Sequence, residues 1–209
     1  MTKKTTTKKK APNKLPTVKR NTKSREQLEK EILKFLYEAS AKRAQGKPGT
    51  PVDNGLGCVL ATSKNNVPRA TPVDFCNDGF TIWIIGDPGK KILNIRSNPR
   101  VGVGVYHPMD RTKLNRSLQI QGKAKLINYK EHRKIFLSAV KKIGVLSTIE
   151  YMADLRIKSG ALTSDQKEAF VEKILCRFNL IRINPDEITY LNIHPKKGMS
   201  KDIWKKRGR

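Results

Sequence analysis

The sequence lacks the features that would place it in a membrane or secreted class. No apolar run approaches the roughly 18 residues that a membrane-spanning helix needs. The basic N-terminus is also not followed by the apolar segment of a secretion signal. We therefore expect a cytoplasmic protein with no membrane span. The Lys- and Thr-rich start shares some features with organelle transit peptides, but it lacks their arginine bias and amphipathic pattern.

Cysteine is scarce, and its positions lie far apart. Cys58, Cys76 and Cys176 are odd in number, and no CxxC pair occurs. This spacing argues against a disulfide framework and against a structural zinc site. We expect all three thiols to be small buried apolar residues.

The motifs of the common catalytic classes are missing as well. His107, His132 and His194 are widely separated, and none belongs to an HExxH or similar metal motif. The sequence contains no P-loop, nucleophile elbow, internal repeat or heptad pattern. The histidines are therefore predicted to be structural or surface residues, no metal site is predicted, and no catalytic acid or base can be assigned.

Acidic residues are almost absent from the two ends of a chain whose formal net charge is +26. Residues 1–23 hold eight lysines and Arg20 with no acid, and residues 195–209 hold seven basic residues against Asp202. Such runs cannot bury enough apolar surface to offset the entropy of ordering, so we expect disordered basic tails at 1–23 and 196–209. The tails could engage nucleic acid, anionic lipid or another acidic partner, or serve only as solubility tails.

Between the tails, residues 24–195 are long enough to form one domain with its own core. Ser24 and Gln27 have the spacing of a capping box, which predicts a helix from there to about residue 44. An apolar stripe suits packing across a sheet, and it consists of Leu28, Ile32, Phe35, Leu36 and Ala39.

Short β-branched and aromatic runs then predict strands. Three of them, joined by the turn sequences KNN and CNDG, predict a β-meander over residues 58–63, 67–75 and 80–85. Two more strands are predicted at 100–106 and 117–127, and the second alternates apolar and polar residues, so that one face is core and the other wet.

The last third of the domain is predicted to be helical and then to end in strands. Residues 129–173 show helical patterns, with Thr163 and Ser164 placed to cap the last helix. Residues 176–193 are interpreted as a closing hairpin joined at the sequence NPD. The whole pattern predicts a mainly β fold with peripheral helices, in the form of a small closed or partly open barrel.

The succession of these segments resembles a known family. The stretch "GCVLATSKNNVPRATPVDFCNDGFTIWIIGDPGKKILNIRSNPRVGVGVY", followed by "SLQIQGKAKLI" and "RFNLIRINPDEITYLNI", is similar to the FMN-binding split β-barrel family related to pyridoxamine 5'-phosphate oxidase. The likeness covers about residues 55–193. It implies a homodimer with two flavin or flavin-like sites at the subunit interface. Members use FMN, the deazaflavin F420 or haem, so membership alone does not assign the chemistry.

A short helix that opens with two lysines suits the phosphate of FMN. Lys90 and Lys91 follow a Pro-Gly turn, where free backbone N–H groups and the helix dipole favour an anion. Asn94 lies one turn further on the same helical face. The alternative is a solvated surface helix, but with the resemblance we favour phosphate binding by these three residues.

The resemblance also implies that the segment "VPRATPVDF" runs along the flavin. Arg69 would lie near the phosphate or ribityl chain, and Thr71 with the backbone of Ala70 and Pro72 near the ring. Its prolines predict an edge strand, a bulged strand or a strand against a ligand. Gln121 is a candidate for the ring edge, although a solvated strand face explains it nearly as well.

The strand "RVGVGVY" leaves one face bare at Gly102 and Gly104. Glycine in a strand marks a ligand, another backbone or a bend. Here a bend or dimer packing is favoured over direct flavin contact.

The leading functional prediction is an FMN-dependent oxidoreductase that acts on a small-molecule substrate or reductant. A second hypothesis is a non-catalytic cofactor-binding or sensor protein whose basic arms engage nucleic acid or an acidic partner. A third is haem binding on the same barrel, with His194 as the ligand to test. In each case the cofactor would carry any reaction, and the protein would supply position and positive charge.

Overall fold

The computed structural model describes residues 18–20, 23–41, 55–110 and 112–208. Their strands form one nine-stranded sheet. These strands are β1 (Lys19–Arg20), β2 (Cys58–Lys64), β3 (Val67–Val73), β4 (Cys76–Asp78), β5 (Thr81–Gly86), β6 (Arg100–Tyr106), β7 (Asn115–Asn128), β8 (Asn179–His194) and β9 (Gly198–Lys205). The helices are α1 (Arg25–Ala39), α2 (Lys90–Ser97), α3 (Arg133–Lys142), α4 (Val145–Lys158), the 3-10 turn η1 (Ser164–Gln166) and α5 (Lys167–Leu175).

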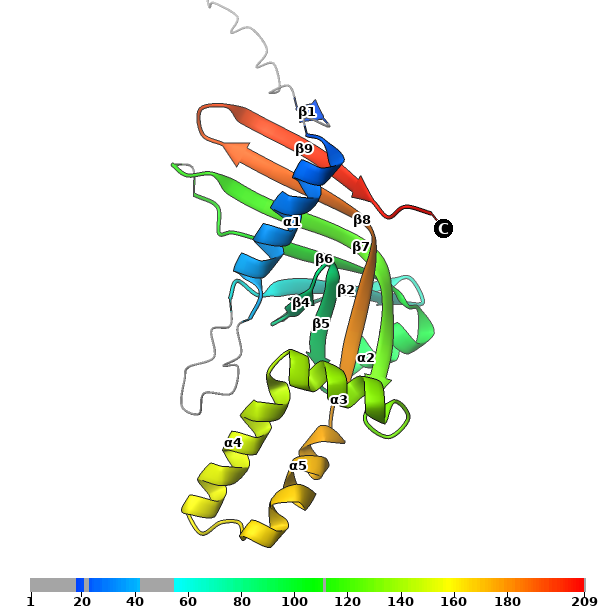
Figure 1. The fold of residues 1–209 in the computed structure, drawn as a ribbon. Helices are drawn as coiled ribbons and strands as arrows, with labels where there is room; N and C mark the ends of the chain where they lie inside the picture. The colour runs from blue at the N-terminus through cyan, green and yellow to red at the C-terminus, as the bar shows by residue number, and fades with distance from the viewer. Residues whose placement is uncertain (1–17, 21–22, 42–54, 111, 209) are drawn as a thin grey trace, which may run out of the picture.

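The sheet divides at its longest strand, β8. The first part of β8 pairs with β5 and the last part pairs with β9, while β7 runs beside both parts. The order β1-β9-β8-β7-β6-β2-β3 leaves β3 as an end strand, so the sheet curls without closing (Figure 1). The predicted mainly β split-barrel fold with peripheral helices is confirmed, and the barrel is approximate because the two ends of the sheet do not pair.

Helix α1 covers the curved sheet near β9 and β8 (Figure 1). The predicted capping box is present, because Ser24 and Gln27 exchange side-chain and backbone hydrogen bonds. All five residues of the predicted apolar stripe are buried. The helix ends at Ala39, before the predicted residue 44, because Ser40 adopts an extended conformation. Residues 42–54, which include most of the Pro- and Gly-rich stretch, lie outside the described ranges.

Helices α3, α4 and α5 follow β7 and precede β8 in the chain, and they form an arm at one end of the sheet (Figure 1). A second apolar cluster joins this arm to the outside of the sheet. Thr163 makes the capping box of η1 with Gln166, so the predicted helix start at the head of α5 is confirmed. The arm therefore has a core of its own, separate from the one inside the barrel.

The predicted closing hairpin at NPD is wrong, because residues on both sides of it belong to the single strand β8. The sequence Asn184-Pro185-Asp186 forms a bulge there, and the pairing register with β7 shifts between Gln121 and Gly122. A Cβ atom added at Gly122 would lie 2.4 Å from the carbonyl oxygen of Asn184. Because Gly122 has no side chain, the bulge around Pro185 can lie close to the backbone of β7.

The predicted β-meander is only partly correct. The first turn is confirmed, because Asn65 and Asn66 both have positive φ and join β2 to β3 in a two-residue hairpin. The sequence CNDG is not simply a turn, since Cys76–Asp78 form β4 and pair with β5. Strand β3 does not pair with β5, so the meander is broken after β3.

The structure also differs from the predicted disorder of residues 196–209. Gly198–Lys205 form β9, which pairs with β8 and, in parallel, with β1. The ring of Trp204 is 7% exposed and stacks on Phe80, and its indole N–H donates to Glu29 at 2.7 Å. Burial alternates along the second half of β9, where Asp202 and Trp204 are buried and Ile203 and Lys205 are exposed. The basic composition of the segment gave no sign of this strand pattern. The predicted disordered tail at 1–23 is likewise wrong at Lys19–Arg20, which form β1. Residues 1–17 and 21–22 lie outside the described ranges, so disorder there stays a prediction.

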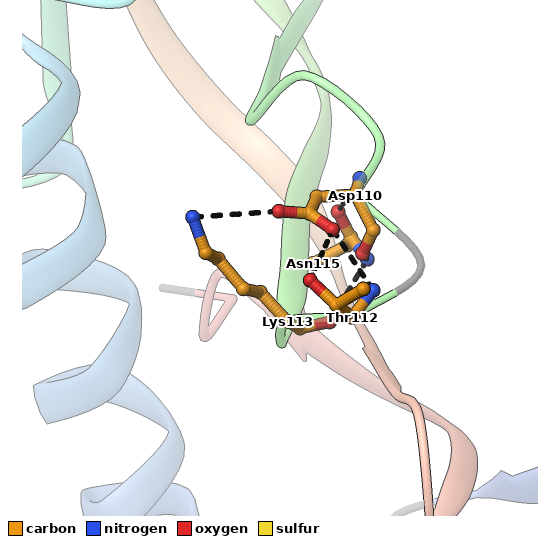
Figure 2. A network of polar contacts seen from close by, with 4 residues as sticks. All are labelled: Asp110, Thr112, Lys113 and Asn115. Atoms are coloured by element: carbon orange, nitrogen blue, oxygen red, sulfur yellow. Dashed lines mark hydrogen bonds and ion pairs between the residues drawn. The ribbon is translucent and has the colours of Figure 1, made fainter.

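A polar network orders the loop between β6 and β7, as Figure 2 shows. The buried Asn115 side chain donates to the carbonyl oxygens of Asp110 and Lys113 and accepts from the Asp110 N–H. The Asp110 carboxylate accepts from both the backbone and the hydroxyl of Thr112. These hydrogen bonds lower the pKa of Asp110.

The three cysteines do not share one environment. Cys58 and Cys76 are buried, as predicted, whereas the prediction for Cys176 is wrong because it is exposed just after α5. Burial raises the pKa of the Cys58 thiol to about 12, and Asp74 contributes in the same direction. No helix within the described ranges is long and apolar enough to cross a membrane.

Candidate functional site

Strand β3 presents two different faces because its side chains alternate. Arg69 is paired with Thr62 of β2, and Thr71 is paired with the fully buried Leu60. Directly opposed residues in an antiparallel pair lie on the same face, so Arg69 and Thr71 share the face of the barrel core. Ala70 and Pro72 lie on the opposite face and are exposed.

The hydroxyl of Thr71 is the most unusual polar group of this face. Its Oγ1 atom is buried and has no hydrogen-bond partner among the residues described. Buried hydroxyls are nearly always paired, because an unpaired one loses its hydrogen bonds to water without compensation. The position therefore suits a ligand that supplies the missing donor or acceptor.

The N-terminus of α2 is open. Its N-cap is Gly89, which has φ 152° and makes no side-chain capping hydrogen bond. A side-chain-bearing residue rarely adopts this conformation, and no heavy atom lies within 4 Å of an added Cβ. The first N–H groups of a helix have no intrahelical partner. Lys90 is exposed and Lys91 half-buried beside them, so the helix start concentrates positive charge.

The structure places Asn94 differently from its predicted role at the phosphate. Its side chain is only 9% exposed, and Nδ2 donates to Thr62 Oγ1 at 3.1 Å. One turn further on, Asn98 donates to Ser63 at 3.0 Å. These two hydrogen bonds fasten α2 to β2, so Asn94 acts as a positioning residue for the helix that carries the lysines.

The link through Thr62 brings the two halves of the candidate site together. Thr62 is the residue that contacts α2, and it is also the cross-strand neighbour of Arg69. Arg69 therefore lies on the side of the sheet that α2 covers. The sequence analysis did not identify Thr62, and it included Gly89 only as part of the Pro-Gly turn before the two lysines.

Gln121 does not belong to this face. It pairs with Gly102, which pairs in turn with Ala61, and Ala61 pairs with Ala70. This row lies on the outer face of the sheet, where Gln121 lines a pocket of about 380 Å³. Within one chain, Gln121 and Arg69 are thus on opposite sides of the sheet.

The outer face carries little side-chain bulk around the two glycines of β6. An added Cβ at Gly104 would meet no heavy atom within 4 Å, and one at Gly102 would make only ordinary contact with Ala61. Val101, Val103 and Val105 point into the core as predicted. The glycines therefore do not mark a close approach within the chain, and dimer packing stays a prediction. Tyr106, 54% exposed, borders this face, while Pro72 lines a further pocket of about 610 Å³.

The histidines are involved in packing and turns. His107 stacks on Phe35 with ring centroids 5.0 Å apart, and burial lowers its pKa, with the Arg116 charge adding to the effect. His194 Nδ1 accepts from the backbone N–H groups of Lys196 and Lys197, so a neutral ring carries its proton on Nε2. No group of three or more His, Cys, Asp or Glu residues suited to a metal ion occurs in the described part of the chain.

Comparison with known proteins identifies the family. The model of the pyridoxamine 5'-phosphate oxidase family matches residues 56–192, more than half of the chain. The chain therefore belongs to this family, as its sequence predicts. The match spans β2 through most of β8 and includes every residue of the candidate site. No curated protein matches at a significant level.

Several solved structures are similar to this chain at low sequence identity. A pyridoxamine 5'-phosphate oxidase-related, FMN-binding protein from Nostoc punctiforme is 15% identical, with a TM-score of 0.51 over 73% of this chain and 82% of its own. A putative pyridoxamine 5'-phosphate oxidase from Listeria innocua is 22% identical, with a TM-score of 0.46 over 77% and 95%. The heme storage protein HutZ of Vibrio cholerae is 15% identical, with a TM-score of 0.45 over 76% and 89%.

Proposed function

We propose that the chain binds FMN between β3 and α2 and acts as a flavin-dependent oxidoreductase on a small-molecule substrate or reductant. The observation that carries the proposal is the unpartnered hydroxyl of Thr71, buried on the same strand face as Arg69 and beside a helix that opens with two lysines. Cation, backbone N–H and hydroxyl groups are the partners that a flavin mononucleotide requires.

Each residue has a distinct part in this proposal. Lys90, Lys91 and the open N–H groups of α2 hold the phosphate, and Arg69 adds a second cation from β3. Thr71 supplies a hydrogen bond near the ring, together with the backbone of Ala70 and Pro72. Asn94 holds α2 against β2. FMN supplies the hydride or electron chemistry when it is bound, and the nearby cations would favour the negative charge of its reduced form.

We place the contact with a second copy of the chain on the outer face of the sheet. Ala61 and Ala70 are exposed there with the half-buried Gly102 and Gly104 beside them, and this lack of side-chain bulk suits close packing of two sheets. Packing on this face would place Gln121 at the subunit interface, on the opposite side of the sheet from Arg69 and Thr71 of the same chain. The homodimer with cofactor sites at the interface that the resemblance implies stays a prediction.

Two observations support FMN rather than haem. The fold neighbour from Nostoc punctiforme is an FMN-binding protein, which supports a flavin in this chain. The ring of His194 uses Nδ1 for the β8–β9 turn, and its Nε2 proton opposes haem ligation. The deazaflavin F420 stays an alternative cofactor. Nucleic-acid binding by the basic tails and a cytoplasmic location stay predictions, the former because residues 1–17 lie outside the described ranges.

The test is an absorbance spectrum of the freshly purified protein, before and after FMN is added and the sample is desalted. We expect flavin bands that stay with the protein and bleach when a reductant such as a reduced nicotinamide is added. A Soret band would replace the proposal with haem binding. An FMN-treated sample that keeps no flavin after desalting would contradict the proposed site.

A further inference from the structure

A pocket of about 390 Å³ lies under helix α3, away from the proposed flavin site. Its sheet side is formed by Asp78 of β4, Trp83 of β5 and Arg182 of β8, and Trp83 and Arg182 are direct cross-strand partners. Their neighbours Ile82 and Ile183 belong to the core inside the barrel. Trp83 and Arg182 therefore point to the outer side of the sheet, toward the helical arm. None of the residues proposed for FMN lines this pocket.

The helix side of the pocket alternates cationic and apolar groups. Lys134, Ser138 and Lys142 recur every four residues along α3, so they lie on one helical face. Ile135 and Ala139 fill the spaces between them. With the 8%-exposed ring of Trp83 opposite, the pocket has an apolar floor and a charged rim. Its volume lies within the range of small-molecule sites, roughly 300 to 1,000 Å³.

Arg182 has a buried nitrogen atom without a hydrogen-bond partner among the described residues. Its Nε atom is buried and makes no hydrogen bond, and the guanidinium forms no ion pair with any residue that the structure describes. A buried guanidinium N–H without a partner is costly, because it has lost water without replacement. Its planar fork matches a carboxylate or phosphate better than any other anion.

The charges of the pocket do not cancel. Asp78 is its only acidic lining residue among those the structure describes, and it is already paired with Lys142 at 2.7 Å. Lys134 and Arg182 have no acidic partner among the described residues, and Lys125, the β7 residue beside Arg182, adds a further exposed cation. The excess of positive charge therefore faces a pocket whose floor is an aromatic ring.

We propose that this pocket binds a small organic anion that carries a carboxylate or phosphate on a flat apolar body. The anionic head pairs with Arg182 and Lys134, and the apolar body lies against Trp83 and the apolar residues of α3. An inorganic anion would leave the apolar floor unused, and a neutral aromatic molecule would leave Arg182 unpaired. The proposal does not depend on flavin binding, because the two sites share no residue.

The experiment is a titration of the full chain with phenyl phosphate and with benzoate, followed in 1H–15N correlation spectra. The chain has two tryptophans, so only two indole N–H signals arise, and Trp83→Phe assigns them. We expect saturable movement of the Trp83 signal while the Trp204 signal stays in place. Benzyl alcohol and inorganic phosphate, which each carry half of the proposed ligand, should bind at least about tenfold more weakly than phenyl phosphate. Comparison of the two anions shows whether the head group is a phosphate or a carboxylate.

Two variants separate this site from a general effect of charge. Arg182→Gln should weaken phenyl phosphate binding by about tenfold to a hundredfold, the usual effect of losing a charge-assisted hydrogen bond. Arg177→Gln removes the same charge from an exposed position just before β8 and should leave the affinity for phenyl phosphate unchanged. The pair Arg69→Ala and Lys91→Ala, which removes the proposed flavin phosphate contacts, should also leave the Trp83 response intact.

Three outcomes would overturn the proposal. The first is a Trp83 signal that does not move with either anion up to about 1 mM. The second is equal affinity for Arg182→Gln and the wild-type chain, with both spectra well dispersed. The third is binding of benzyl alcohol as tight as that of phenyl phosphate, which would make the pocket merely apolar. Loss of flavin binding in Arg69→Ala with an unchanged Trp83 response would support both sites independently.

Discussion

The hydroxyl of Thr71 and the ammonium group of Lys91 approach the proposed flavin from different elements. Thr71 is held by its pairing with Leu60, and Lys91 by the attachment of α2 to β2 through Asn94. Neither group is needed for the fold in the way that a core residue is. Substitutions at these positions therefore separate ligand binding from stability.

Replacement of Thr71 by Val should have opposite effects on the free protein and on its complex. The valine removes a buried hydroxyl that lacks a partner, so we expect the cofactor-free protein to keep its stability or gain up to about 1 kcal/mol. The same change should reduce the rise in melting temperature that FMN produces. Thermal unfolding with and without FMN measures both effects, and an unchanged FMN shift would exclude Thr71 as a contact.

Loss of a cation at the start of α2 should weaken cofactor binding. We expect Lys91→Ala, and separately Arg69→Ala, to reduce the affinity for FMN by about 1 to 3 kcal/mol, the value of a charge-assisted contact. Arg96→Ala at the exposed far end of the same helix is the matched control. Fluorescence titration of FMN gives the affinities. Wild-type affinity in both alanine variants would contradict the proposed phosphate site.

The buried thiol of Cys58 should be inert and Cys176 reactive. The Cys58 pKa of about 12 means that almost no thiolate exists in the folded protein at pH 8, whereas Cys176 is exposed. Because the pKa is raised from its usual value near 9, its contribution to stability is present below pH 9 and is lost as the pH rises toward 12. A thiol-specific reagent at pH 8 should label one residue rapidly in the folded chain, and Cys176→Ser should abolish this labelling. Rapid labelling that persists in Cys176→Ser would show that a buried thiol is accessible.

At the scale of the elements, β7 and β8 show how one missing side chain determines a pairing. The sequence NPD has the composition of a turn, and a local rule assigns a hairpin to it. The structure instead keeps one strand through the proline, because Gly122 on β7 leaves room for the bulge and β7 continues to pair on both sides. A local sequence pattern contains no information about what lies across the sheet.

The two glycines on neighbouring strands should respond differently to alanine. Gly122→Ala places a methyl group 2.4 Å from the carbonyl oxygen of Asn184, so we expect a loss of about 1 to 3 kcal/mol in the free energy of unfolding. Gly104→Ala meets no neighbouring atom and should change stability by less than about 0.5 kcal/mol. Urea unfolding followed by circular dichroism measures both variants. Equal stabilities would show that the bulge moves freely.

At the scale of the whole molecule, the strands of one chain leave an open end at β3 and an exposed face of small residues. Both lie at the proposed flavin site or beside it. An edge strand with exposed apolar neighbours is normally covered in the native assembly. The proposed dimer would cover this sheet face and the open edge at β3.

A large side chain at Gly104 should separate the subunits without unfolding them. Gly104→Arg points into open space in the single chain, so we expect a folded monomer that retains little FMN. Ala169→Arg, which adds the same side chain on an exposed face of α5, should remain dimeric and keep its flavin. Sedimentation velocity and flavin content test both variants. A Gly104→Arg dimer with full flavin would place the interface elsewhere.

Local patterns in the sequence determined the elements whose signals are short in range. The capping box of α1, the strand Arg100–Tyr106 and the alternation in β7 follow from hydrogen bonds and side-chain periods within a few residues. The two lysines after a Pro-Gly turn were visible for the same reason. The succession of these patterns was enough to predict the family, which the match over residues 56–192 confirms.

The tertiary structure alone decided everything that depends on pairing between distant segments. The basic segment forms β9 because Trp204 stacks on Phe80 and donates a hydrogen bond to Glu29, two residues far earlier in the chain. The tertiary structure placed Gln121 on the opposite side of the sheet from Arg69, since the register of three neighbouring strands fixes both faces. It left the Thr71 hydroxyl and the Arg182 Nε atom without hydrogen-bond partners among the described residues, which no one-dimensional pattern records. The physical reason is that burial and partnership depend on what the fold brings from elsewhere, whereas periodicity and turns depend only on neighbours in the chain.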